Sequence, residues 1–150
     1  MKKFQFSLDS VLSYKQQVLD ALKGEHAAIL AQVHAQEDVL EAVWQEYRDC
    51  NAQFCQRKAE GMTIADAMFY ESGLRVLERN IQRETDKLEE LRRKEEKKRQ
   101  EVVDAKIDTS SIEKLREHKL EDYNKAVQKD EEKLIDEFIS SAQARANIGA

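Results

Sequence analysis

Apolar residues recur along the first part of the chain with alternate spacings of four and three. Between Leu8 and Phe54 this spacing selects fourteen positions, of which eleven are apolar. They are Leu8, Leu12, Lys15, Leu19, Leu22, His26, Ile29, Val33, Gln36, Leu40, Val43, Tyr47, Cys50 and Phe54. A repeat of about 3.5 residues held this long predicts a helix whose stripe is buried against another helix in a left-handed coiled coil. We call this stripe the seam.

A turn is predicted around Gly61. Glycine suits the left-handed residue that ends a helix, and Thr63 can cap a new helix with Asp66 in the capping-box position. A short helix over about 64–70 is expected next. It should precede Gly73, where the cost of about 1 kcal/mol for a glycine inside a helix indicates a kink or a close approach of another group. The predicted fold is all-α, a long antiparallel two-helix coiled-coil hairpin with a short helix near the hinge and a C-terminal helical overhang.

The seam resumes beyond Gly73 with a weaker pattern. Its twelve positions, eight of them apolar, are Leu74, Leu77, Ile81, Glu84, Leu88, Leu91, Glu95, Lys98, Val102, Ala105, Thr109 and Ile112. Two consecutive steps of four then lead to Leu120, a stutter that locally unwinds a supercoil. We expect one domain over residues 1–150, with arm one at about 7–60, hinge and short helix at 61–72, and arm two at about 73–147.

The two predicted arms differ in length. If Phe54 faces the start of arm two across the hinge, Leu8 lies opposite residue 122, and about 25 residues extend past the first arm. We call this segment the overhang. Its stripe should lack an intramolecular partner and comprises Tyr123, Val127, Leu134, Ile135 and Phe138. An uncovered apolar stripe indicates a protein-binding surface, and we favour a different protein over a second copy of the chain.

The composition agrees with long helices and excludes several functions. Charged residues make up 37% of the chain, proline is absent and the net charge is -5, which disfavours a nucleic-acid-binding protein. One basic cluster, residues 92–99, is interpreted as a solvated helix face with ion pairs; nucleic-acid binding is the less favoured alternative. No signal peptide or apolar run of about eighteen residues is present, so we expect a cytoplasmic or peripheral protein without an integral membrane segment.

Residues that could support catalysis or metal binding are scattered. His26 and His34 lie about 12 Å apart along a helix, too far to share a metal without further ligands. Cys50 and Cys55 are expected to remain thiols in a reducing compartment. No glycine-rich phosphate loop or nucleophile motif occurs. We therefore predict a protein that is not an enzyme and has no cofactor or metal site.

Three parts of the sequence together resemble the FliJ family, a small coiled-coil component of the bacterial flagellar type III export apparatus. They are Phe4-Gln5-Phe6-Ser7-Leu8-Asp9-Ser10-Val11-Leu12 at the N-terminus, the hinge Gly61-Met62-Thr63 with Tyr70, Leu77 and Ile81 after it, and the C-terminal stretches Ile112-Glu113-Lys114-Leu115-Arg116-Glu117 and Glu131-Glu132-Lys133-Leu134-Ile135-Asp136-Glu137. The resemblance spans the whole chain at matching length.

The resemblance implies a role in flagellum biogenesis, type III protein export and motility. It implies a rod, similar to the central stalk of rotary ATPases, that enters the ring of the export ATPase FliI, promotes its assembly and contacts the export gate protein FlhA. Export chaperones are further partners, and the place is the cytoplasm at the inner face of the membrane. The overhang, through Tyr123, Val127, Leu134 and Phe138, is the expected ring contact. The alternative is a cargo or chaperone-escort adaptor that enters no ring.

The resemblance also implies a gate contact. It falls at Gln36, Leu40, Val43, Tyr47, Leu77 and Glu84. This chain has Val43 and Gly73 where family members commonly carry aromatic residues. Because these gate positions lie on the seam, plain packing between the helices is an equal alternative to partner contact.

Overall fold

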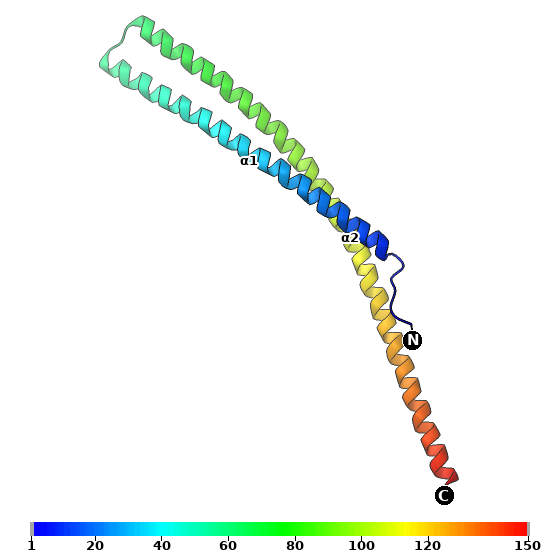
Figure 1. Cartoon of the computed structure of the whole chain (residues 1–150). Helices are drawn as coiled ribbons and strands as arrows, with labels where there is room; N and C mark the ends of the chain where they lie inside the picture. Colours follow the sequence, from blue (N-terminus) through cyan, green and yellow to red (C-terminus); the bar gives the residue numbers. More distant parts are fainter. Residues whose placement is uncertain (1, 150) are drawn as a thin grey trace. The chain divides into compact units, whose positions relative to one another are not determined.

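Two long helices make up nearly all of the structure. A computed structural model describes residues 2–149, with α1 at Asp9–Glu60 and α2 at Ile64–Ile148, and no strand occurs among these residues. Pairs of contacting residues run in opposite directions along the two helices, since Gln36 bonds Glu84 whereas His26 bonds Glu95. The predicted all-α helical hairpin is confirmed (Figure 1).

The hinge has the predicted chemistry. Gly61 has a φ of 97°, the left-handed conformation that favours glycine. The backbone amide of Asp66 donates to Thr63 Oγ1 at 3.1 Å, so Thr63 caps α2. The prediction of a separate short helix is wrong, because α2 runs unbroken from Ile64 through Gly73. The close approach expected at Gly73 is absent too, because a Cβ added there would meet no atom within 4 Å. The seam residues that follow Gly73 pack against α1 and offset the modest helix cost of a single glycine.

Contacts divide the chain into two units that are described separately. The hinge unit is Asp20–Val103. In it α1 and α2 lie side by side, cyan against green in Figure 1. All predicted seam positions of this unit are buried or half-buried, and the most buried are Val33, Phe54, Ile81, Glu84 and Leu88. The heptad pattern therefore identified the interior of the hinge unit correctly.

The terminal unit comprises the residues up to Leu19 and those from Asp104 onward. Helix α1 begins at Asp9, after a turn at residues 7–8. The buried residues here are Phe6, Leu12, Leu19 and Thr109. Thr109 Oγ1 donates to the carbonyl of Ala105 at 2.8 Å, which satisfies its hydroxyl inside the seam.

The extended N-terminal segment covers α2 further than predicted. The hydroxyl of Tyr123 donates to the carbonyl oxygen of Lys2 at 2.7 Å, and its ring lies 5.6 Å from that of Phe4. The prediction that Tyr123 lacks an intramolecular partner is therefore wrong. The prediction considered only the pairing of the two helices. Residues 2–6 precede α1, and an extended segment can cover an apolar side chain as well as a helix can. Every residue from 128 to 149 is exposed.

Candidate functional site

The residues expected at the gate contact all lie on the interhelical seam of the hinge unit. Five are half-buried and Glu84 is buried. The half-buried ones are Gln36, Leu40, Val43, Tyr47 and Leu77. The structure thus brings the six residues into one stripe between α1 and α2. Each of them contributes to packing and leaves at most an edge of its side chain at the surface.

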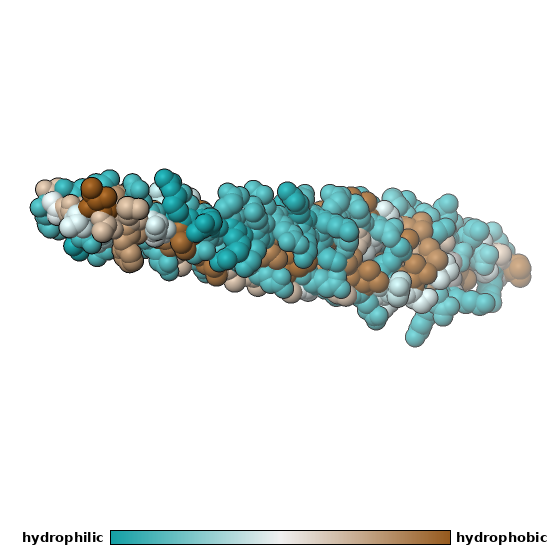
Figure 2. All heavy atoms as spheres, turned by 90° about the horizontal axis from the view of Figure 1, so that it is seen from above, coloured by the Kyte–Doolittle hydropathy of each residue, from teal (hydrophilic) through white to brown (hydrophobic). Residues whose placement is uncertain are grey.

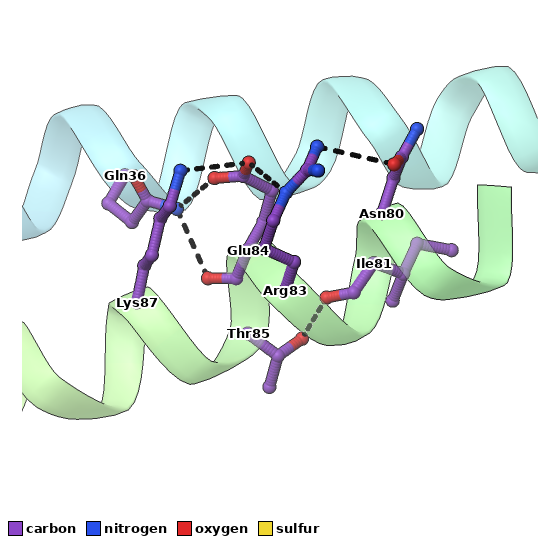
Figure 3. Close-up of polar contacts among 7 residues, drawn as sticks. All are labelled: Gln36, Asn80, Ile81, Arg83, Glu84, Thr85 and Lys87. Atoms are coloured by element: carbon purple, nitrogen blue, oxygen red, sulfur yellow. Dashed lines mark hydrogen bonds and ion pairs between the residues drawn. The ribbon is translucent and has the colours of Figure 1, made fainter. Parts of the chain in front are cut away.

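Gln36 and Glu84 form a polar layer across this stripe (Figure 3). Gln36 Nε2 donates to Glu84 Oε2 at 2.6 Å and to the Glu84 carbonyl oxygen at 3.1 Å. On α2 itself, Lys87 Nζ lies 3.4 Å from Glu84 Oε1 and Arg83 Nε lies 3.7 Å from it. Both carboxylate oxygens of Glu84 therefore have partners, as a buried charge requires.

These contacts set the charge state of Glu84. The hydrogen bond from Gln36 lowers the pKa of the Glu84 carboxyl below its ordinary value, and Lys87 and Arg83 lower it further, whereas burial acts in the opposite direction. The carboxylate is therefore ionised at neutral pH. It holds α1 and α2 together at one register and has no proton to donate there.

A second polar region occupies the weak part of the seam. His26 Nε2 lies 2.8 Å from Glu95 Oε1. Lys98 Nζ bonds Glu101 at 2.8 Å and, across the helices, Glu25 at 2.9 Å. The bond to Glu101 and then that to Glu25 raise the pKa of Lys98. The polar side chains at these seam positions thus have bonded partners. These bonds specify the register of the two helices at the expense of apolar packing.

The basic cluster at 92–99 lies along the same helix. Arg92 pairs with Glu37 of α1 at 3.3 Å, Lys94 pairs with Glu90 at 3.6 Å, and Arg99 pairs with Glu96. The pattern agrees with a solvated helix face carrying ion pairs. Among residues 2–149 no group of three His, Cys, Asp or Glu side chains is placed to hold a metal ion.

The overhang carries the predicted apolar stripe, except at its base. Tyr123 and Val127 are half-buried. Leu134 is 65% exposed and Phe138 76%. Ile135 and Ile139 extend the stripe on the same helix. In Figure 1 this orange to red part of α2 has no helix beside it. The uncovered surface thus begins after Val127.

Sequence reasoning missed a second set of exposed apolar residues, which follows the hinge on α2. Ile64, Met68, Phe69 and Val76 are all exposed. The signal was present in the sequence, because these four apolar residues lie outside the four-three spacing that defines the seam. Figure 2 shows that hydrophobic residues also reach the surface elsewhere, in separate groups among hydrophilic ones.

Comparison with known protein families identifies this chain's family. The family model described as "Flagellar FliJ protein" matches residues 4–147. No curated protein matches the chain, and no solved structure does. Neither helix, over the residues described, has a stretch both long and apolar enough to span a bilayer.

Proposed function

The chain belongs to the FliJ family, a component of the flagellar protein export apparatus, and from this premise we propose that it is a non-enzymatic stalk that binds and promotes assembly of the FliI ATPase ring. The observation that carries this proposal is the uncovered stripe of the overhang. Leu134 and Phe138 lie one turn apart on one side of α2, and both are largely exposed. Apolar side chains exposed in this arrangement favour a protein partner that buries them.

The charge of the overhang fits a contact that forms and releases. Glu131 and Arg145 share the side of α2 that carries the apolar residues, and Glu132 lies at its edge, so both signs of charge adjoin the stripe. A mixed rim adds specificity without locking the partner in one position. The apolar stripe then supplies the affinity, and the charges supply the orientation.

The gate contact with FlhA is the second part of the proposal. Its support is the stripe of Gln36, Leu40, Val43 and Tyr47, which presents edges at the surface beside the exposed ring of Trp44. The Trp44 and Tyr47 rings meet edge to face at 5.8 Å. Aromatic pairs of this kind are frequent anchors at protein interfaces.

The ring contact is tested by ATP turnover and ring assembly of FliI with the variant Leu134→Asp/Phe138→Asp. The matched control is Ser140→Asp/Gln143→Asp, which adds the same charge to the other side of the overhang, where both residues are exposed. We expect the unaltered chain and the control to stimulate assembly and the stripe variant to lose this effect. A wild-type chain without effect on FliI at excess would refute the stalk function and leave the chaperone-escort adaptor as the better account.

The gate contact is tested separately by binding of FlhA to the variants Tyr47→Ala and Trp44→Ala. Urea unfolding of each variant measures the loss of packing independently. Loss of FlhA binding with a fold that persists under the binding conditions supports the contact. Unchanged FlhA affinity in both variants would assign this stripe to packing alone.

A further inference from the structure

The first five turns of α2 carry an apolar face that no part of the described chain covers. Its members are Ile64, Met68, Phe69 and Val76, which are 81%, 63%, 77% and 45% exposed. We call residues 64–83 on this side of α2 the hinge face. Monomeric helices seldom leave four large apolar side chains this exposed within four turns, and such a face marks an interaction surface.

Helix geometry places the hinge face opposite the seam. At about 100° per residue, the four apolar residues fall within an arc of about 140° on the helix. The seam residues Leu74, Leu77 and Ile81 centre on the other side and are buried or half-buried against α1. The hinge face therefore takes no part in holding the hairpin together. Its residues are free to serve a contact outside the chain.

The charged residues within this arc are all arginines. Arg75, Arg79 and Arg83 are spaced four apart and share the arc with the apolar residues, whereas Glu71 and Glu78 fall outside it. Arg75 bonds Glu78 at 3.1 Å at the edge of the arc. Arg79 makes no hydrogen bond or ion pair with any residue from 2 to 149. Arg83 lies 3.7 Å from Glu84 of the seam, so Glu78 and Glu84 adjoin the face without lying within its arc. The face thus combines exposed apolar side chains with arginines, and Arg79 is the one whose charge has no acidic partner among residues 2–149.

We propose that the hinge face binds the surface of a membrane that contains anionic lipids. A helix with apolar residues and arginines on one side lies in the interface, with its apolar side chains among the acyl chains and its guanidinium groups at the phosphates. The face is the outer surface of one helix and is convex. A lipid surface accommodates such a face without a preformed groove, whereas a protein partner would need one.

The overhang provides an internal comparison. Its stripe exposes Leu134 and Phe138 to a similar degree, at 65% and 76%. The arc that contains these residues holds Glu131 and Arg145 and no row of arginines. If exposed apolar area alone drove lipid binding, the two stripes would be equivalent. Charge complementarity assigns the lipid contact to the hinge face.

The test is co-sedimentation of the full chain with vesicles of phosphatidylcholine alone and of phosphatidylcholine with an equal part of phosphatidylglycerol. We expect binding to the anionic vesicles that weakens as salt is raised, and little binding to the neutral ones. Met68→Ser/Phe69→Ser and Arg75→Gln/Arg79→Gln should each weaken binding by about tenfold or more. The control Leu134→Ser/Phe138→Ser removes similar apolar area and should bind as the unaltered chain does.

Each variant should keep its helices, because the substituted side chains are exposed, and circular dichroism checks this. Failure of the unaltered chain to bind anionic vesicles overturns the proposal. So does equal binding by the hinge-face variants, or an equal loss in the overhang control. If vesicles are not bound and Met68→Ser/Phe69→Ser weakens binding of FlhA instead, the hinge face is a protein-docking surface and the lipid proposal is refuted. These outcomes are independent of FliI assembly.

Discussion

Phe54 closes the apolar seam at the hinge end of α1, and its truncation measures how strongly packing there stabilises the hairpin. The side chain is 5% exposed. Its ring stacks on that of Tyr70 with centroids 5.3 Å apart, and Lys58 Nζ lies 3.8 Å from its centroid. Truncation of a buried phenylalanine costs about 3–5 kcal/mol. We expect about 3 kcal/mol for Phe54→Ala, because a seam of two helices can close partly around a small side chain.

Urea unfolding followed by the fluorescence of Trp44, the single tryptophan, reports this loss within the hinge unit. Phe54→Leu keeps apolar volume but loses the ring contacts, so it should cost about 1–2 kcal/mol. Phe69→Ala is the control, since that ring is 77% exposed, and it should change stability by less than about 0.5 kcal/mol. Equal, small effects of Phe54→Ala and Phe69→Ala would refute the assignment of Phe54 to the core.

Three further predictions concern glycines, pH and the N-terminal segment. Gly73→Ala should raise the free energy of unfolding by about 0.5–1 kcal/mol, because an added Cβ meets no atom within 4 Å and alanine favours the helix. Gly61→Ala should lower it by about 1 kcal/mol through strain at the positive φ; urea midpoints of opposite sign check this pair, and a shift of equal sign contradicts it. The pKa of Glu84 is lowered in the folded state, so its contribution to stability is present above the ordinary carboxyl value of 4.5 and is lost as pH falls through the lower folded pKa. The stability difference between the unaltered chain and Gln36→Met should therefore shrink on acidification below that value, as urea titrations across pH would measure, and a difference that is constant with pH would count against the polar layer. Tyr123→Phe removes the hydrogen bond to the Lys2 carbonyl and should cost about 0.5–1.5 kcal/mol, seen as faster amide exchange in residues 2–12 with no change near the hinge; unchanged exchange would show that the hydroxyl does not hold this segment.

The sequence predicted the seam well because helix pairing requires a regular four-three spacing of apolar residues, and this spacing remains visible when a few of its positions are polar. Polar positions such as His26, Gln36 and Lys98 fell into register with their apolar neighbours, and the structure gives each a bonded partner. The hinge was equally readable, since Gly61 and Thr63 each meet a local backbone requirement. These features depend on spacing and on short-range chemistry, which a sequence contains directly.

The helix through Gly73, the covering of Tyr123 and the hinge face were not predicted, because they depend on the balance between local helix preference and tertiary packing, which residue spacing does not reveal. The helix cost of Gly73 led to the prediction of a separate short helix before it, but α2 continues through this glycine because packing of the seam residues outweighs the cost. Tyr123 is covered by an extended segment whose path follows no period. The hinge face was overlooked because apolar residues outside the seam have no internal partner to define them. Which partners the overhang and the hinge face bind stays a prediction for the same reason.

The short connection between α1 and α2 limits how this chain can change in length. Only residues 61–63 separate the two helices. One residue inserted into either helix would turn every later side chain by about 100° and carry seam residues into solvent, and the connection is too short to absorb the error. Insertions of seven residues at facing positions of both helices preserve phase and pairing. We therefore expect length differences among functional relatives to come as paired heptads, or to collect beyond Val127, where no second helix dictates the count.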